Sequence, residues 1–412
     1  MPILDEPSTM PRRLALRTVL FRLHWLAGIS AGLVLAVVGV SGGLIGMRAA
    51  LEHFLDPAPA PAGRAPLTPD RWIGSARTAW PDAGVRSIEW NSEGERVRLR
   101  LARGTGPGED VALDPYSGAP MPLRGREVFE GIERVHRTLA AGPVGKQLVG
   151  ASTALLIAIV LGGIYLRWPR RPLSPGAWLL VDPRLRGRAL LWRLHAVAGT
   201  WLLGFYLLAA ATGLWWSYAP YRDAVNRMAG VPSQQRRPRA AALEPGMAPV
   251  ALDGAWAAFR AAVPEATRAT FTPVGDASTP LEIRYLTADS PHERAWNSIR
   301  IDAGSGAVVG RELQAQQPRG RRFIGALYAL HSGSFFGAGG STLMVIASLL
   351  MPFFAITGLW LWLLRRRAAA DAAGSTRTGQ RASGSRARSN ANCATPIRAF
   401  PDTVHTASDR SR

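Results

Sequence analysis

Four long apolar stretches divide the polar parts of the chain. Runs of about 18 or more predominantly apolar residues lie at residues 26–47, 148–168, 196–217 and 341–364. An α-helix rises about 1.5 Å per residue, so each run is long enough to cross the apolar core of a bilayer. The pattern predicts a membrane protein that is mainly α-helical and has four transmembrane helices.

The two longest polar segments between these runs have the periodicity of small α+β domains. In the first, "LTPDRWIGSARTAWP" has the apolar spacing and the Thr-Pro-Asp start of a helix. Alternating runs near 85–90, 96–102 and 109–114 follow, and then the turn "DPYSG". The second segment has "LDGAWAAFRAAVP", alternating runs near 268–273, 281–286 and 295–301, and the turn "DAGSG". Each segment predicts an external domain with one helix and an antiparallel sheet.

The apolar runs and their flanking residues repeat along the chain. The stretch "RLHWLAG" at residues 22–28 returns as "RLHAVAG" at residues 193–199, an offset of 171 residues. An offset of 195 residues carries His136 onto His331, and "GIYL" at 163–166 onto "GLWL" at 358–361. Repetition at a fixed spacing indicates a duplicated structural unit. We therefore expect two tandem repeats, each made of a span, an external α+β domain, a histidine segment and a second span.

The repeats define the boundaries that the sequence predicts. In chain order these are a cytoplasmic N-terminus at 1–17, transmembrane helix 1 at 18–48, an external domain at 49–130, a histidine segment with transmembrane helix 2 at 131–168, a cytoplasmic arginine-rich loop at 169–189, transmembrane helix 3 at 190–217, a second external domain at 218–320, a histidine segment with transmembrane helix 4 at 321–364, and a tail at 365–412. The tail is rich in Ser, Arg, Gly and Ala and lacks an apolar period, which predicts disorder.

The net charge of +20 comes almost entirely from arginine. The arginines gather before the first apolar run, between the second and third, and after the fourth. The positive-inside rule makes these segments cytoplasmic and places both termini on the cytoplasmic side. This placement favours a membrane role over nucleic-acid binding. The single cysteine, Cys393, excludes an internal disulfide and a haem attached through thioether bonds.

These motifs together resemble the PepSY-associated transmembrane family. The resemblance rests on the paired "RLH…G" entry helices, the external segments that end in Asp-x-x-Ser-Gly, and the Gly–apolar–aromatic exit before arginines, and it covers residues 16–367. It implies a multi-pass protein of the bacterial inner membrane with PepSY-like external domains. Members of that family include reductases of ferric siderophores that carry two haems.

Histidines at equivalent positions of the two repeats are the candidate functional residues. The chain has seven histidines, and four lie beside the spans at repeat-equivalent positions: His24, His136, His195 and His331. The other three have no repeat counterpart: His53, His292 and His405. A single histidine at a membrane edge is often only a half-hydrated interfacial residue. Four in two equivalent pairs favour a functional site, because ionisable groups at membrane depth are costly and usually have a partner.

The predicted topology brings these histidines together in two pairs. His24 and His195 lie at the cytoplasmic ends of their spans, and His136 and His331 lie on the external side. Two facing neutral imidazoles are the axial ligands of a low-spin b-type haem in a helical bundle. Zinc and copper also bind imidazole, but two ligands leave either ion short of a closed shell. The sequence predicts two b-type haems, the inner with iron ligands His24 and His195, the outer with His136 and His331.

Small and basic residues flank the predicted ligands. Gly28 and Gly199 lie one helical turn beyond His24 and His195, where a missing side chain leaves room either for a flat macrocycle or for tight helix packing. Arg134 and Arg137 bracket the outer ligand, where guanidinium groups suit haem propionates, an anionic substrate or lipid headgroups.

Two haems at opposite membrane faces predict a transmembrane electron-transfer oxidoreductase. About 23 residues, or roughly 35 Å of helix, separate His24 from the outer end of its span, and one cofactor would not bridge that length. No G-x-G-x-x-G motif follows a strand, so the expected donor is a separate flavin, reductase or quinol. A ferric siderophore as the periplasmic acceptor follows from the resemblance alone. The alternatives are a non-enzymatic, membrane-anchored PepSY binding or regulatory protein and a transporter.

Overall fold

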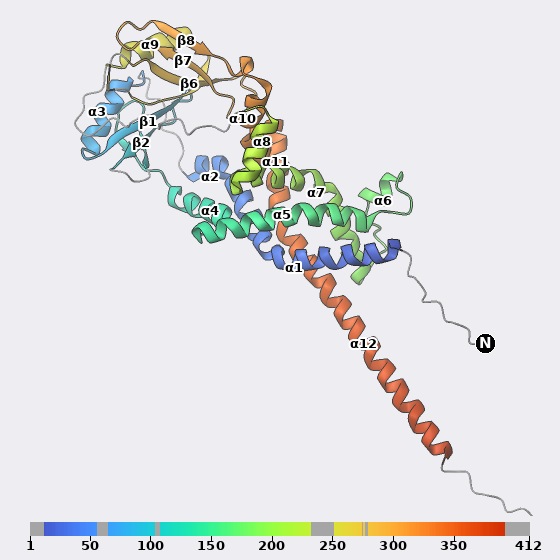
Figure 1. The fold of residues 1–412 in the computed structure, drawn as a ribbon. Helices are drawn as coiled ribbons and strands as arrows, with labels where there is room; N and C mark the ends of the chain where they lie inside the picture. The colour runs from blue at the N-terminus through green and yellow to red at the C-terminus, as the bar shows by residue number, and fades with distance from the viewer. Residues whose placement is uncertain are drawn as a thin grey trace, which may run out of the picture. The chain divides into compact units, whose positions relative to one another are not determined.

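A computed structural model describes residues 12–55, 65–103, 108–231, 251–273, 275–276 and 279–391 (Figure 1). The helices are α1 (Arg12–Gly46), α2 (Arg48–Leu55), α3 (Pro69–Ala79), α4 (Arg126–Thr138), α5 (Gly142–Arg167), α6 (Pro175–Leu179), α7 (Gly187–Ser217), α8 (Ala219–Met228), α9 (Asp253–Ala262), α10 (Arg319–Ser332), α11 (Gly337–Leu349) and α12 (Met351–Ala391), with 3-10 turns η1 (Gln314–Gln316) and η2 (Ser334–Phe336). The strands are β1 (Gly84–Asn91), β2 (Val97–Ala102), β3 (Glu109–Leu113), β4 (Pro120–Met121), β5 (Ala266–Phe271), β6 (Leu281–Thr287), β7 (Asn297–Ile301) and β8 (Val308–Glu312).

Four helical segments are long and apolar enough to cross a membrane, as the sequence predicts. They are Leu16–Gly46, Gly142–Arg167, Gly187–Ser217 and Ser334–Asp371. Many large apolar side chains on these segments point outward; Leu33, for example, is 76% exposed. Such surfaces are stable in contact with lipid, and a helix satisfies all its backbone hydrogen bonds internally. The protein is therefore a mainly helical, multi-pass membrane protein.

Small residues let the spanning helices approach each other closely. α1 packs against α4, α5 and α11, and α5 packs against α7. A Cβ atom at Gly39 would lie 2.5 Å from Cβ of Met351, and one at Gly46 would lie 2.6 Å from a methyl group of Val345. Lipid is as apolar as the helix surface, so close van der Waals contact at small residues is what holds such helices together.

A buried arginine fixes the end of α5. The side chain of Arg167 is only 8% exposed. Its guanidinium donates hydrogen bonds to the carbonyl oxygens of Ala177, Trp178 and Ala196 and to the hydroxyl oxygen of Thr200. Because a buried charge is stable only when it is hydrogen-bonded, these contacts tie α5 to α7 and to the loop between them.

One antiparallel sheet contains strands from both long polar segments. Its order is β4-β3-β2-β1-β5-β6-β7-β8. The strands coincide with the predicted alternating runs, and the structure adds β4 and β8 at the edges. The expectation of two separate external sheets differs from the structure, because β1 pairs with β5 with Ile88 opposite Phe271 and Trp90 opposite Ala269. The reason is shared burial: apolar residues of both halves and of α3 and α9 form one core.

Two aspartates join α3 to α9. The carboxylate of Asp253 accepts hydrogen bonds from the backbone N–H of Asp70 at 3.0 Å and from the hydroxyl of Thr68 at 2.7 Å. In return, the carboxylate of Asp70 accepts from the backbone N–H groups of Leu252 at 2.9 Å and Asp253 at 3.2 Å. Each helix is thus capped by the other one, which favours their common orientation. Burial, and then the neighbouring charge of Asp253, raise the pKa of Asp70.

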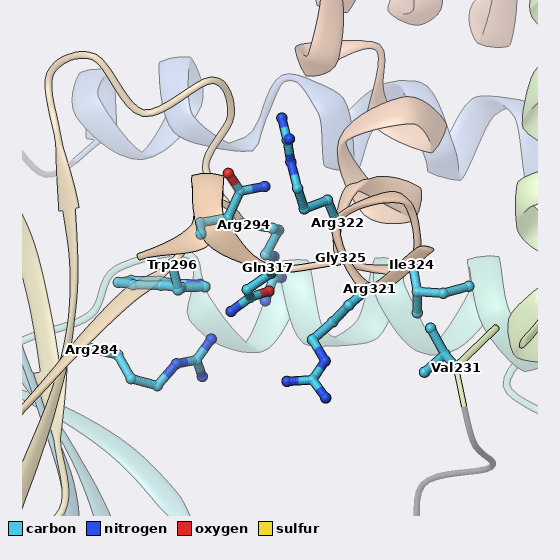
Figure 2. A pocket seen from close by; sticks show the side chains of 10 residues that line it. Val231, Arg284, Arg294, Trp296, Gln317, Arg321, Arg322, Ile324 and Gly325 are labelled. Carbon is cyan, nitrogen blue, oxygen red and sulfur yellow. The ribbon is translucent and has the colours of Figure 1, made fainter. Parts of the chain in front are cut away.

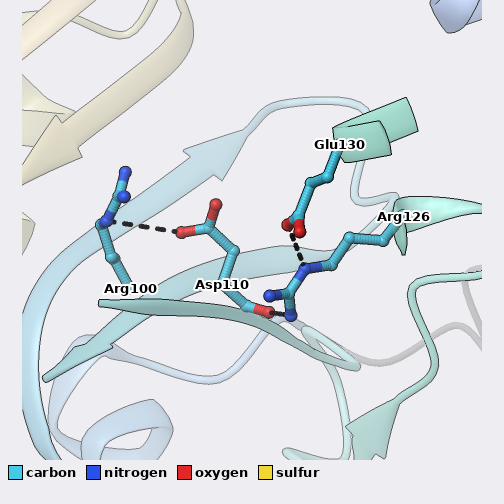
Figure 3. A network of polar contacts seen from close by, with 4 residues as sticks. All are labelled: Arg100, Asp110, Arg126 and Glu130. Atoms are coloured by element: carbon cyan, nitrogen blue, oxygen red, sulfur yellow. Dashed lines mark hydrogen bonds and ion pairs between the residues drawn. The ribbon is translucent and has the colours of Figure 1, made fainter. Parts of the chain in front are cut away.

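Polar contacts anchor the start of α4 to the sheet (Figure 3). Nε of Arg126 donates to Oε1 of Glu130 at 2.7 Å, and the same guanidinium donates to the backbone carbonyl of Asp110 in β3. The carboxylate of Asp110 lies 3.7 Å from Nε of Arg100 on β2. The helix that carries His136 therefore begins at a point fixed by the external sheet.

The helix that contains the second half of the fourth apolar run extends further than the sequence predicts. α12 continues to Ala391, so residues 365–391 are helical where the composition predicts disorder. Five alanines among residues 368–373 have the highest helix propensity of any residue type and continue the helix. Residues 392–412, which include Cys393 and His405, lie outside the described part of the chain.

Candidate functional site

His136 on α4 and His331 on α10 lie close to each other. The ring centres of His136 and His331 are 6.3 Å apart, with an angle of 63° between the ring planes. A metal–imidazole bond of about 2.0 Å, together with about 1.1 Å from the nitrogen to the ring centre, puts the centres of two trans imidazoles about 6 Å apart. The two rings are therefore spaced as the axial ligands of one metal would be.

Hydrogen bonds set the tautomer of both rings. Nδ1 of His136 lies 2.9 Å from the carbonyl oxygen of Val38 and 3.4 Å from the hydroxyl of Ser41. Nδ1 of His331 lies 3.1 Å from the carbonyl oxygen of Ala209 and 2.9 Å from the hydroxyl of Thr212, and that hydroxyl donates its own proton to α7. A carbonyl oxygen only accepts, so Nδ1 carries the proton in each ring and Nε2 keeps a free lone pair.

The surroundings of His136 and His331 favour the neutral form of both rings. Burial, and then the neighbouring His136, lower the pKa of His331 to about 4. Burial also lowers the pKa of His136. No hydrogen bond joins Nε2 of either ring to another residue in the described part of the chain. The two free Nε2 lone pairs are available to a ligand at neutral pH.

The second predicted pair consists of His24 on α1 and His195 on α7, which are close enough to interact electrostatically. Nδ1 of His195 donates to the hydroxyl of Thr357 at 2.7 Å, and that hydroxyl donates in turn to the carbonyl oxygen of Phe353 at 2.6 Å. The chain of donors again leaves Nε2 of His195 unprotonated. Of the two predicted pairs, His136 and His331 have their ring centres 6.3 Å apart, and the role of all four histidines as ligands stays a prediction.

Four glycines that contact the histidine rings were not identified from the sequence. A Cβ atom at Gly42 would lie 2.9 Å from Cε1 of His136, and one at Gly213 would lie 3.3 Å from Cε1 of His331. A Cβ atom at Gly163 would lie 3.2 Å from Cε1 of His24, and one at Gly358 would lie 3.7 Å from Cε1 of His195. The offsets of 171 and 195 relate these glycines in pairs. Glycines shared by the two repeats were the signal that could have identified them.

One hydrogen bond to a histidine ring differs between the two repeats. Thr357, which accepts from His195, corresponds to Gly162 at the offset of 195. Nδ1 of His24 is consequently buried without a hydrogen bond of normal geometry. A Cβ atom at Gly162 would lie 3.9 Å from that nitrogen, so a short side chain there could reach it. His24 and His195 are therefore held differently.

An apolar layer separates the two histidine pairs. On α1 the groups that contact His136 lie 14 to 17 residues beyond His24, and α7 shows the same spacing beyond His195. This spacing corresponds to roughly 21–26 Å of helix. The buried cluster between the pairs includes Tyr206 and Phe354, whose ring centres are 5.6 Å apart, and Phe354 lies 5.3 Å from the ring of His195.

Glycines turn the chain between His136 or His331 and the span that follows it. Gly142 and Gly337 begin α5 and α11 with φ of 57° and 72°. Positive φ costs glycine little and other residues more. Side chains at Gly145 and Gly340 would overlap the carbonyl oxygens of Thr138 and Gly333. Both turns are therefore tight, and the two histidines enter the bundle in the same way.

The PepSY-associated TM region is the family whose model matches residues 21–365, which is most of the chain. The protein belongs to the PepSY-associated TM family. This confirms the resemblance seen in the sequence. An uncharacterized protein of Pseudomonas aeruginosa is 28% identical over 256 residues, and the match covers 58% of this chain and 64% of that relative. The chain thus spans less than two thirds of the length of this curated relative.

In this PepSY-associated TM protein, the other residues that the sequence predicts beside the histidines do not touch the histidine rings. A Cβ atom at Gly28 would meet nothing within 4 Å, whereas one at Gly199 would lie 3.6 Å from Phe354. Arg137 forms an ion pair of 3.0 Å with Glu133 on its own helix. The guanidinium of Arg134 lies near Gly131. These arginines are on the helix of His136, and the structure leaves their predicted role in anion binding untested.

The unrepeated histidines occupy other surroundings. His292 is buried, accepts a hydrogen bond from the backbone N–H of Arg294 at 3.2 Å, and lies 6.0 Å from the ring of Phe335. The side chain of His53 lies outside the described residues. Among the residues that the structure describes, no group of three or more His, Cys, Asp or Glu side chains could hold a bare metal ion. Each site therefore offers two imidazoles and requires any further metal ligands from a bound group.

Proposed function

We propose that the protein is a transmembrane electron-transfer oxidoreductase that uses two bis-histidine b-type haems. Electrons pass from a cytoplasmic flavin, a reductase or a membrane quinol to a periplasmic acceptor such as a ferric siderophore. The observation that carries the proposal is the histidine pairing: the ring centres of His136 and His331 are 6.3 Å apart, and His24 and His195 are close enough to interact electrostatically. In three of the four rings hydrogen bonds hold the proton on Nδ1 and leave the Nε2 lone pair free.

The residues present fit a haem at each level. His24 and His195 would hold the inner haem, and His136 and His331 the outer one. Two imidazoles suffice because a porphyrin supplies the other four nitrogen ligands. A haem bound there would supply one-electron transfer. The protein supplies ligand orientation through Nδ1 and an apolar layer that excludes water between the two levels.

The duplicated architecture supports the same proposal. The contacts of His136 with Val38, Ser41 and Gly42 correspond at fixed offsets to those of His331 with Ala209, Thr212 and Gly213. We therefore infer two tandem repeats with PepSY-like external domains. The arginine-rich segments give a bacterial inner-membrane orientation with both termini in the cytoplasm.

The decisive experiment is haem analysis of the purified protein. We expect a low-spin b-type reduced-minus-oxidised spectrum and a pyridine haemochrome value of two haems per chain. Both haems should be extractable into acidified solvent, because the only cysteine lies at position 393 in the tail. One haem per chain would exclude the two-site arrangement. No haem would favour the membrane-anchored binding or regulatory protein.

The hydrogen bond from His195 to Thr357 gives a prediction about the inner site. Thr357→Val removes the hydroxyl that accepts from Nδ1, and such partners of metal-bound histidines typically contribute about 10- to 100-fold in metal affinity. We expect the inner haem to bind more weakly by a similar factor and its midpoint potential to change, whereas Thr357→Ser should restore both. Haem titration and redox titration measure these effects. Unchanged inner-haem affinity and potential in Thr357→Val would contradict this role.

The corresponding glycine supplies the opposite variant. Nδ1 of His24 is buried without a hydrogen bond of normal geometry. Gly162→Ser should place a hydroxyl acceptor beside it and should therefore tighten haem binding at the inner site. A variant that weakens haem binding instead would show that the space at Gly162 is needed for packing.

A further inference from the structure

The loop between β6 and β7, residues 288–296, joins the sheet to the end of α10. The hydroxyl of Ser334 lies 2.8 Å from both carboxylate oxygens of Glu293 and donates a hydrogen bond to this carboxylate. The guanidinium of Arg294 lies 4.4 Å from the ring centre of Tyr328. On the chain, Tyr328 comes shortly before His331 and Ser334 shortly after it. The β6–β7 loop therefore holds the chain on both sides of this histidine.

The β6–β7 loop also faces the beginning of α10. Arg294 and Trp296 line a cavity of about 190 Å³ together with Arg321, which belongs to the first turn of α10 (Figure 2). The backbone N–H of Arg294 donates a hydrogen bond of 3.2 Å to Nδ1 of the buried His292, which closes a turn inside the loop. The loop therefore faces α10 from its first turn to the 3-10 turn that follows it.

The corresponding segments of the first repeat lack the side chains for these contacts. The connection between β2 and β3, residues 103–108, is shorter than the β6–β7 loop. At the offset of 195 residues, Ser334 corresponds to Leu139, which has no donor group. Tyr328 corresponds to Glu133, which has no aromatic ring. The contacts of the β6–β7 loop are thus an addition to the second repeat rather than a part of the duplicated pattern.

His331 lies near a helix end that depends on contacts from outside the helix. α10 ends at Ser332, directly after His331, and Gly333 with a φ of 82° follows. The last turn of a helix lacks some of its hydrogen bonds and frays unless other groups hold it. A carboxylate is unfavourable beside the C-terminal end of a helix dipole, so Glu293 does not stabilise α10 through its charge. Its hydrogen bond from Ser334 instead fixes the chain just beyond His331.

We propose that Glu293 is a positioning residue for the pair of His136 and His331. Through Ser334 it holds the end of α10 and keeps the ring of His331 at a fixed angle to the ring of His136. This inference rests on the proposed electron-transfer function, in which these two rings are the axial ligands of the outer haem. Groups beyond the ligands of a metal orient those ligands and thereby tune the metal. The β6–β7 loop would give the sheet this influence over the outer haem.

Three variants separate the hydrogen bond from the charge. Glu293→Ala removes the acceptor, Ser334→Ala removes the donor, and Glu293→Gln keeps an acceptor oxygen without the charge. In phosphatidylcholine nanodiscs, the full-length alanine variants should keep two haems per chain and shift gmax of the outer haem in the electron paramagnetic resonance spectrum. The reason is that gmax of a bis-imidazole haem depends on the angle between the ring planes. Glu293→Gln should restore the gmax of the unmodified protein.

Hydrogen–deuterium exchange tests the same contact independently of haem. The backbone amides of residues 328–334 should exchange about tenfold faster in both alanine variants, as expected for the loss of one hydrogen bond to a charged group. Glu293→Gln should restore most of the protection. Glu312→Ala is the matched control, because Glu312 lies 3.5 Å from Arg321 at the opposite end of α10. It should change neither the exchange of residues 328–334 nor gmax.

The outcomes distinguish positioning from packing and from charge. Faster exchange with an unchanged gmax in the alanine variants would overturn the proposal, because the contact would then be structural only. Unchanged exchange in Glu293→Ala would overturn it as well. An equal shift of gmax in Glu293→Gln and Glu293→Ala would assign the effect to charge and also overturn it. A protein without haem that shows the expected exchange pattern would refute the electron-transfer function alone and leave Glu293 as the group that fixes His331.

Discussion

Replacement of His136 by alanine should reduce the haem content from two to one per chain. The ring centres of His136 and His331 are 6.3 Å apart, and their Nδ1 atoms are bound to α1 and α7 respectively. Removal of one ring leaves a single axial ligand, so the low-spin site with two imidazoles cannot form at the external level. The inner pair lies roughly 21–26 Å of helix away and should keep its haem. Pyridine haemochrome analysis and electron paramagnetic resonance of the oxidised protein measure both effects.

Because the two histidines would hold one haem together, the prediction extends to the second histidine and to the double variant. His331→Ala should give the same spectrum as His136→Ala, and the double variant should lose nothing more, because residues that act as one unit are not additive. His292→Ala is a demanding control, since that histidine is also buried but should leave both haems in place. Two retained haems in His136→Ala, or different spectra for the two single variants, would refute the external pair.

The sequence predicts the local elements and the histidine pairs well, because both depend on patterns that a single chain displays. The four spans follow from continuous apolar length, and strands such as β6 at Leu281–Thr287 follow from alternation. The pairing of His136 with His331 follows from duplication together with membrane depth. The position of these residues inside the helical bundle could be predicted without knowledge of tertiary contacts.

Contacts between distant segments were not predictable in the same way. Alternation identifies the buried face of a strand but not its neighbour, so the pairing of β1 with β5 and the fusion of two sheets were missed. The reciprocal caps of Asp70 and Asp253 join residues 183 positions apart. The two repeats differ in that Thr357 corresponds to Gly162. This difference is visible in the sequence, but its effect depends on which histidine ring each residue contacts.

The second large effect concerns the direction of electron flow across the membrane. In sealed inside-out vesicles, reduced flavin mononucleotide added outside reaches only the cytoplasmic face, and iron(III) citrate enclosed in the lumen reports reduction at the external face. The unmodified protein should reduce the enclosed iron. His24→Ala should retain the outer haem but lose this reduction, falling to the rate of vesicles without the protein, because the first electron-accepting site is missing. Dithionite applied to right-side-out vesicles should still reduce the outer haem of His24→Ala.

His136→Ala should show the reverse behaviour, and the two variants together locate both ends of the path. Its inner haem should be reduced by external flavin in inside-out vesicles, while the enclosed iron stays oxidised because no outer site passes electrons on. Flavin added to right-side-out vesicles of the unmodified protein should reduce no haem within the time that it needs to reduce the inner haem of inside-out vesicles. This control tests for leakage and for the orientation inferred from the arginines. Normal reduction of the enclosed iron by His24→Ala would remove His24 from the path. In that case the histidine of "RLHWLAG" would be an interfacial residue, and its unpaired Nδ1 would reflect packing beside Gly163 rather than preparation for a metal.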